Sequence, residues 1–177
     1  MSYVLKRKRI TMPNWCQNEV RVQADDRGKA EAFVNFVRDT NTDNYFSFNR
    51  ILPMPDELEG TRSPATIVTQ EEYDNFEVSK DDKLHGIGKP ITQEISDRFK
   101  REYGYDNWYD WAIRNWGTKW NTDCTEVDID DWGGVEYNFD TAWGPPEEIY
   151  HRLRELFPDI EISWFYREDG NQIAGWL

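Results

Sequence analysis

Residues 135–168 read VEYNFDTAWGPPEEIYHRLRELFPDIEISWFYRE, and their pattern contains a strand, a helix and a second strand. Apolar side chains occupy every second position at both ends of this stretch, which is the spacing of half-buried strands. The middle begins with two prolines and then Glu147 and Glu148, which suit the first turn of a helix because of its dipole. Apolar residues then recur at helical spacing until Pro158 ends the helix. We therefore predict a strand–helix–strand unit.

The residues on the N-terminal side of this unit continue the pattern. Residues 18–24 alternate and predict a half-buried strand, and residues 30–37 have one apolar helical face that Asp25 or Asp26 can cap. Residues 46–51 also have the composition of a strand. Alternation over 125–130 predicts the strand that precedes the opening unit.

Two turns connect strands that follow one another in the sequence. Residues 131–134 read DWGG and predict a tight turn into the strand at 135–141. Asp169 and Gly170 predict a second turn, which leads into a last strand over 172–177. Both turns join antiparallel neighbours.

The centre of the chain does not follow this pattern. Residues 53–91 are irregular, acidic and interrupted by Pro and Gly, and they are too long for an ordinary loop of a compact domain. Thr92 and Asp106 can each cap a helix, and the second helix ends at Gly117. We therefore expect an insertion at about 53–117.

The order of these elements predicts an α+β fold. An antiparallel sheet with two helices on one face, in a ferredoxin-like split βαβ sandwich, fits the order best. Residues 12–177 would form a single domain, because a chain of this length can bury a sizeable core without disulfides or metals. Residues 1–11 carry four bases and no acid, and we expect them to be a flexible basic extension before an alternative start at Met12.

The composition of the 177 residues limits the function classes. Nine Trp, nine Tyr and nine Phe supply core area and argue against disorder. The two cysteines, far apart in sequence, are typical of a cytosolic protein, and we expect a cytoplasmic location. No apolar run is long enough for a membrane span.

The net charge of −13 comes from two stretches of the sequence. Residues 56–82 hold nine acids and two bases, and residues 123–140 hold seven acids and no base. This acidity disfavours direct binding to nucleic acid, which requires clustered Lys and Arg. The stretches are either solvated surface or a surface that meets a basic partner. The candidate partner-binding residues are Glu71, Glu72, Asp74, Glu126, Asp128, Asp130 and Asp131.

No metal or other cofactor is expected. Glu126, Asp128 and Asp130 share one face of a predicted strand, but Phe139 stands where an EF-hand loop would need its last Glu. His85 and His151 have no Cys or His at zinc-ligand spacing.

A second candidate site is rich in tryptophan. Six of the nine Trp lie between residues 108 and 143, among polar and basic side chains. Such a cluster can form a stacking pocket, although Trp on a helix face also serves as ordinary core. The candidate pocket residues are Trp111, Arg114, Asn115, Trp116, Thr118, Lys119, Trp120, Thr141 and Trp143. We expect Trp111, Trp116 and Trp143 to share a core or a pocket wall.

Four segments together resemble a known family. They are PNWCQN at 13–18, the stretch from Trp111 to Trp120 with its NWGTKW, FDTAWGPP at 139–146, and YRE at 166–168 with Gly175. In this order they resemble the YubB-like family of phage and conjugative-plasmid proteins, over nearly all of residues 12–177. The resemblance implies a ferredoxin-like domain, a bacterial cytoplasm and a mobile genetic element. It implies no reaction and therefore no catalytic residue.

These observations leave several functions open. The leading hypothesis is a non-enzymatic acidic binding protein that inhibits a basic host protein, such as a CRISPR-Cas or restriction component. The alternative is a small-ligand or nucleotide-binding or modifying protein built on the NWGTKW pocket. A third is a structural accessory module. The sequence leaves the oligomeric state and the identity of the partner open.

Overall fold

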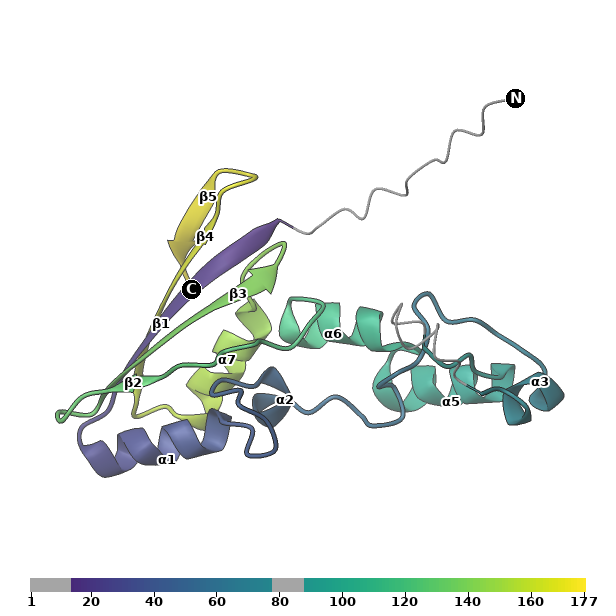
Figure 1. Cartoon of the computed structure of the whole chain (residues 1–177), viewed down its shortest axis with the longest axis horizontal. Helices are drawn as coiled ribbons and strands as arrows, with labels where there is room; N and C mark the ends of the chain where they lie inside the picture. The colour runs from purple at the N-terminus through teal and green to yellow at the C-terminus, as the bar shows by residue number, and fades with distance from the viewer. Residues whose placement is uncertain (1–13, 78–87) are drawn as a thin grey trace.

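The structure, a computed structural model, describes residues 14–77 and 88–177 (Figure 1). The predicted extension at 1–11 lies outside these residues. Within them, no helix is long and apolar enough to cross a membrane.

The centre of the fold is a five-stranded sheet with the order β2-β3-β1-β4-β5. All four neighbouring pairs are antiparallel. The strands are β1 (Trp15–Gln23), β2 (Asp128–Ile129), β3 (Gly134–Ala142), β4 (Glu161–Glu168) and β5 (Ile173–Trp176).

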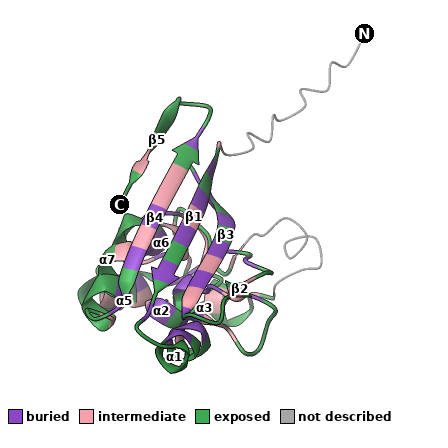
Figure 2. Ribbon diagram, turned by 90° about the vertical axis from the view of Figure 1, so that its left-hand side faces the viewer, coloured by how far each residue is buried: buried purple, intermediate pink, exposed green. Residues whose placement is uncertain are grey.

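Alternation along the strands separates two faces of the sheet. In β1 the side chains of Cys16, Asn18, Val20 and Val22 are buried, whereas their neighbours are more exposed. Figure 2 shows the same alternation in β3. The buried face carries the aromatic core, and the other face is open.

The buried face is covered by the helices α1 (Arg27–Val37) and α7 (Glu147–Leu156), which lie on the same side of the sheet in Figure 1. Asp26, one of the two predicted caps, accepts a hydrogen bond from the Lys29 backbone N–H at the start of α1. With β1 between β3 and β4, and β3 between β1 and β2, this is the split βαβ arrangement of a ferredoxin-like fold. The predicted fold class is confirmed, and β5 adds a fifth strand beside β4.

The predicted strand at 46–51 is wrong. The short helix α2 (Phe48–Ile51) stands there, and Phe46 is fully buried against the sheet. The backbone N–H of Phe46 donates to Asn44 Oδ1, and that of Phe48 donates to Asn121 Oδ1. Side chains therefore satisfy the backbone groups that a strand would have paired with a neighbour.

Among the described residues between α2 and β2 there are three further helices, which are α3 (Gln70–Asp74), α5 (Gln93–Tyr103) and α6 (Trp108–Trp116). Figure 1 shows α3 and α5 well to one side of the sheet, with α6 between them and α7. Thr92 caps α5 as predicted. The cap of α6 is Asn107, which accepts from the Asp110 backbone N–H, rather than the predicted Asp106.

Candidate functional site

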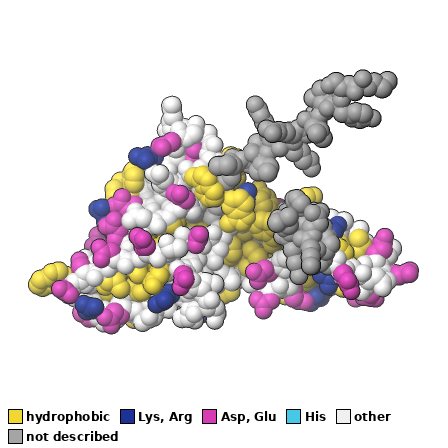
Figure 3. Space-filling model, in the orientation of Figure 1, with side chains coloured by type: hydrophobic (Ala, Val, Ile, Leu, Met, Phe, Trp, Pro, Cys, Tyr) yellow, Lys and Arg dark blue, Asp and Glu magenta, His cyan; other side chains and the backbone are white. Residues whose placement is uncertain are grey.

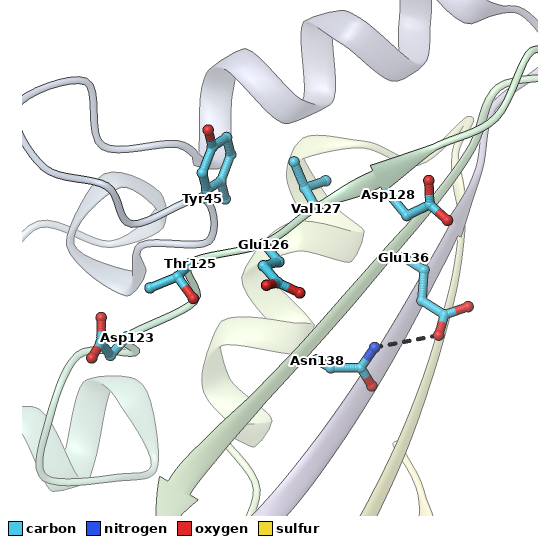
Figure 4. Close-up of a pocket in the computed structure, with 8 residues that line it drawn as sticks. All are labelled: Tyr45, Asp123, Thr125, Glu126, Val127, Asp128, Glu136 and Asn138. Carbon is cyan, nitrogen blue, oxygen red and sulfur yellow. Dashed lines mark hydrogen bonds between the residues drawn. The ribbon is translucent and has the colours of Figure 1, made fainter.

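A hollow opens between β3 and the chain that leads into β2 (Figure 4). The sequence predicted a strand over 125–130, but only Asp128 and Ile129 pair with β3. The preceding residues are drawn towards the helical layer, because the backbone N–H of Tyr45 donates to the carbonyl of Cys124 at 2.7 Å. The segment therefore diverges from β3 and leaves a volume of about 740 Å³.

Four carboxylates line this hollow, and they are Asp123, Glu126, Asp128 and Glu136. No described Lys or Arg side chain lies among the lining residues. Two basic groups lie beside the hollow. Arg21, on the open face of β1, has its Nε 3.4 Å from a Glu136 oxygen, and the Arg38 guanidinium lies 4.3 Å from the centroid of the Tyr45 ring. In Figure 4 the carboxylates of Glu126 and Glu136 come from opposite walls, with the amide of Asn138 near Glu136. The arrangement suits a cationic group better than an anionic one.

Of the four predicted acidic residues in the 123–140 stretch, two line the hollow and two do not. Glu126 and Asp128 line it. Asp130 instead accepts from the backbone N–H groups of Trp132 at 2.7 Å and Gly134 at 2.8 Å, so its carboxylate holds the β2–β3 turn. Asp131 pairs with Arg27 at 3.1 Å.

A second, smaller hollow of about 480 Å³ adjoins the first on the open face of the sheet. Asp128 and Glu136 line both hollows, and Asp130 lines only the second. The acidic surface therefore continues from the edge of the sheet onto its face.

The other acidic stretch does not join this surface. Glu71, Glu72 and Asp74 lie on α3, at the opposite end of the molecule from β2 in Figure 1. Glu72 forms a capping box with Thr69, and Asp74 accepts from Gln70 at 2.7 Å. The fold therefore places the two acidic stretches apart, and the candidate acidic residues do not gather on one surface.

Sequence reasoning missed Asp123 and Glu136 as members of the hollow. Both belong to the acidic stretch at 123–140, and Glu136 stands on the polar side of the alternating β3 strand. This alternation was the available signal for Glu136, whereas the position of Asp123 depends on the tie between Tyr45 and Cys124.

The tryptophans of the second candidate site divide into a buried and an exposed group. Trp111 and Trp116 are buried on α6, with ring centroids 5.6 Å apart, and Trp116 Nε1 donates to the Leu52 carbonyl. Trp143 does not join them, because its side chain is 46% exposed. The prediction that these three residues share one core or wall is wrong for Trp143.

The threonines in and near NWGTKW form hydrogen bonds with backbone groups. Thr118 Oγ1 donates to the Ala142 carbonyl at 3.1 Å and accepts from the Ala142 N–H at 3.2 Å. Thr141 Oγ1 donates to the Gly144 carbonyl and accepts from the Asn18 amide. At Gly117, with φ of 80°, an added Cβ would lie 3.3 Å from Pro146 Cα. The motif therefore forms a close-packed corner between α6, β3 and α7.

Three exposed tryptophans, Trp15, Trp120 and Trp143, lie where the end of β3 meets α6, an area that is hydrophobic in Figure 3. The ring centroids of Trp15 and Trp120 are 6.0 Å apart, and Lys119 Nζ lies 3.5 Å from the Trp120 centroid. Partial burial lowers the pKa of Lys119. The backbone N–H of Trp143 donates to the Asn14 carbonyl, which holds Trp143 at the same end of the sheet.

Arg114 and Asn115, also predicted for the Trp-lined pocket, lie elsewhere. They line a hollow of about 270 Å³ between α6 and α7, together with Glu148, Arg152 and Glu155. The Asn115 amide donates to the Trp111 carbonyl at 2.9 Å. The structure therefore does not bring the nine predicted pocket residues into one cavity.

The two cysteines and Tyr137 are buried titratable groups. Burial raises the pKa of Cys16 and of Cys124 to about 11, so both thiols are protonated at neutral pH. Burial also raises the pKa of Tyr137, whose hydroxyl has no hydrogen-bond partner among the described residues. No group of three or more His, Cys, Asp or Glu side chains placed to hold a metal occurs within 14–77 and 88–177.

With the geometry described, the chain can be compared with known proteins. The fold and the hollow define an acidic ferredoxin-like α+β protein. Residues 115–176, which include β2 to β5 and α7, match a family model described as a ferredoxin-like domain in Api92-like protein.

The crystal structure of a protein api92 from Yersinia pseudotuberculosis is 14% identical to this chain, covers 93% of each chain and gives a TM-score of 0.49. No curated protein matches the sequence.

Proposed function

We propose that this chain is a non-enzymatic binding protein whose acidic hollow receives a basic segment of a protein partner. One observation carries the proposal: four carboxylates line a single open hollow whose lining includes no described Lys or Arg side chain, with Arg21 pairing with Glu136 from the face of the sheet. Carboxylates that face each other across a hollow focus a negative potential, which attracts Lys and Arg side chains and speeds their association.

The resemblance to the YubB-like family supports a more specific form of the proposal. In that form the protein belongs to a phage or conjugative plasmid and acts in the cytoplasm of a bacterial host. Its partner is a host protein that handles nucleic acid or takes part in defence, because such proteins carry basic surfaces for phosphate backbones. Occupying that basic surface would inhibit the partner.

The alternative, a ligand pocket at NWGTKW, receives less support. The hydroxyls of Thr118 and Thr141 are engaged by backbone groups, and Trp111 and Trp116 fill the core. The exposed Trp15 and Trp120 lie on a surface rather than in a described cavity. We therefore base the proposal on the acidic hollow.

The first test measures binding of a fluorescent Lys- and Arg-rich peptide by anisotropy. The double variant Glu126→Gln with Asp128→Asn removes two charges from the hollow and leaves the turn-holding Asp130 unchanged. Each exposed charge pair contributes about 0.2–1 kcal/mol, so we expect affinity to fall about 2- to 30-fold. Raising the salt concentration should also weaken wild-type binding steeply, because it shortens the Debye length.

The matched control is Glu71→Gln with Asp74→Asn, which removes the same charge from α3. It should leave peptide affinity nearly unchanged. An equal loss in both double variants would show that the peptide responds only to net charge, and this would contradict a specific hollow. The same three proteins used as baits in bacterial lysate, at low and high salt, should retain a partner in the control and lose it in the hollow variant.

A further inference from the structure

The outer edge of β5 has backbone groups that no other described segment pairs. The backbone N–H of Leu177 donates to the Trp164 carbonyl, so residue 177 faces β4. Because antiparallel partners alternate, Ile173 and Gly175 also face β4, whereas Ala174 and Trp176 direct their N–H and C=O groups outward. Two N–H groups and two C=O groups therefore stand on a free edge.

This edge lacks the features that usually protect a free strand. The sequence of β5 is IAGW, with no charged residue and no proline. Trp176 is 64% exposed and Ile173 is also exposed. Protected edges carry Lys, Pro or a bulge, and an unprotected edge is a template for another strand. At the opposite edge of the sheet, by contrast, β2 is two residues long and lies beside Asp130 and Asp131.

We propose that β5 pairs antiparallel with β5 of a second copy of this chain, which joins the two sheets edge to edge. In the register that places Ala174 opposite Trp176 of the second copy, every outward N–H and C=O of these two residues finds a partner. The two-fold axis then passes beside Gly175, and the same patch serves both copies.

The side chains fit this register. Trp176 and Ala174 lie on the open face, since they pair with Phe165 and Arg167 of β4. Each Trp176 ring, already 5.2 Å from the Phe165 centroid, would then cover the small Ala174 of the other copy. Pairs of a large and a small side chain across neighbouring strands pack well, and one segment supplies both members.

The side chains of this edge add no charge repulsion to the approach of a second copy. Each chain has a net charge of −13, but residues 173–177 carry no charged side chain. The acidic hollow lies at the other edge of the sheet, so a pair formed through β5 leaves both hollows free for their proposed partner. The association is independent of the proposed function, and its salt dependence has the opposite sign. Salt screens repulsion between two acidic chains and strengthens their pairing, whereas it weakens the binding of a basic segment.

The test is sedimentation velocity on the full chain from about 1 µM to about 500 µM, a range suited to a weak association. We expect a concentration-dependent dimer that becomes stronger at higher salt. Ala174→Pro removes one outward N–H while the groups that face β4 remain, and it should weaken the dimer at least about tenfold. Ala174→Asp retains that N–H but places a carboxylate against the indole of Trp176 of the second copy and adds to the repulsion between two acidic chains, so it should weaken the dimer similarly.

Trp132→Ala is the matched control, because this indole is 83% exposed in the β2–β3 turn, away from β5. It should leave the dimer unchanged. Circular dichroism establishes that each variant keeps its fold, and Ala174→Asp decides the matter if Ala174→Pro does not. Three results would overturn the proposal: a monomer at every concentration, a dimer that both folded Ala174 variants retain, or a dimer that Trp132→Ala abolishes as well.

Discussion

The sheet region and the region from α3 to α5 are stabilised by different kinds of interaction. In the sheet region, Trp164, Tyr137 and Phe46 are fully buried, and their rings lie within 4.8–5.7 Å of one another in the pairs Phe46–Tyr137 and Phe46–Trp164. Long strand pairs, such as that of β1 with β3 along nine residues, close over this core.

The region from α3 to α5 depends on shorter and more exposed contacts. Two isolated bridges, Thr61 with Lys89 and Ile67 with Ile91, connect its chain segments. The guanidinium of Arg98 pairs with Glu57 at 2.7 Å, with both side chains largely exposed. Exposed ion pairs contribute little, and few buried rings support them. This region should therefore open locally at a lower free energy than the sheet.

The largest expected effect comes from removing a ring from the sheet core. Trp164→Ala deletes a fully buried indole and leaves the Asn18 Oδ1 that accepts from its Nε1 without that donor. Such truncations cost about 3–5 kcal/mol, which we expect in the free energy of unfolding measured by urea denaturation. The exposed Trp132→Ala should change this value by less than about 0.5 kcal/mol. Equal losses in the two variants would contradict the assignment of the core.

A smaller effect should follow from removing the cap of α6. Asn107 is buried, and its side-chain oxygen accepts from the Asp110 N–H at 3.0 Å. We expect Asn107→Ala to lower stability by about 0.5–2 kcal/mol, whereas Asn107→Ser retains a capping oxygen and should cost less. Urea denaturation measures the loss, and hydrogen exchange should place the increased opening in α5 and α6 rather than in β1. Increased exchange spread evenly over β1 and α6 would show that the two regions unfold together.

The smallest effect concerns pH. Partial burial acts to raise the pKa of Asp106, but hydrogen bonds from Lys100, Ser96 and Asn107 outweigh it and hold the pKa below its ordinary value. Hydrogen bonds from Arg98 and Tyr103 likewise lower the pKa of Glu57. A lowered carboxyl pKa contributes stability above the ordinary Asp and Glu values, and this stability is lost as pH falls through the folded-state pKa.

We therefore expect hydrogen exchange in α5 to rise relative to that in β1 as pH falls from about 6 to about 3, after correction for intrinsic exchange rates. Asp106→Asn should remove part of this pH dependence. A ratio between the two regions that stays constant over this range would show that these carboxylates do not support α5.

The fold was predictable where a local pattern determines the structure. Alternation gave β1, β3 and β4, and helical spacing with Asp26 and the early glutamates gave α1 and α7. The strand predicted at 46–51 failed because distant side chains, above all Asn121, satisfy its backbone. No local pattern contains a contact of that kind.

The candidate site was less predictable than the fold. Composition indicated an acidic surface, and the structure places Glu126 and Asp128 in one hollow. Composition could not show that Asp130 holds a turn or that α3 lies far from β2, because both facts depend on the tertiary structure. The prediction of a shared tryptophan wall failed for a similar reason, since sequence spacing alone does not distinguish the buried Trp116 from the exposed Trp143.

The labelling rates of the two buried cysteines report local opening of the chain. A thiol-reactive reagent attacks the thiolate of an accessible cysteine, so the protonated and fully buried Cys16 and Cys124 react only after the chain around them opens. Cys16 lies in the central strand, and its labelling rate reports opening of the sheet. Cys124 lies between Asp123 and Thr125, which line the hollow, and its rate reports release of this segment from Tyr45. A ligand that spans the hollow should therefore slow the labelling of Cys124 more than that of Cys16, which gives a readout of occupancy that needs no knowledge of the partner.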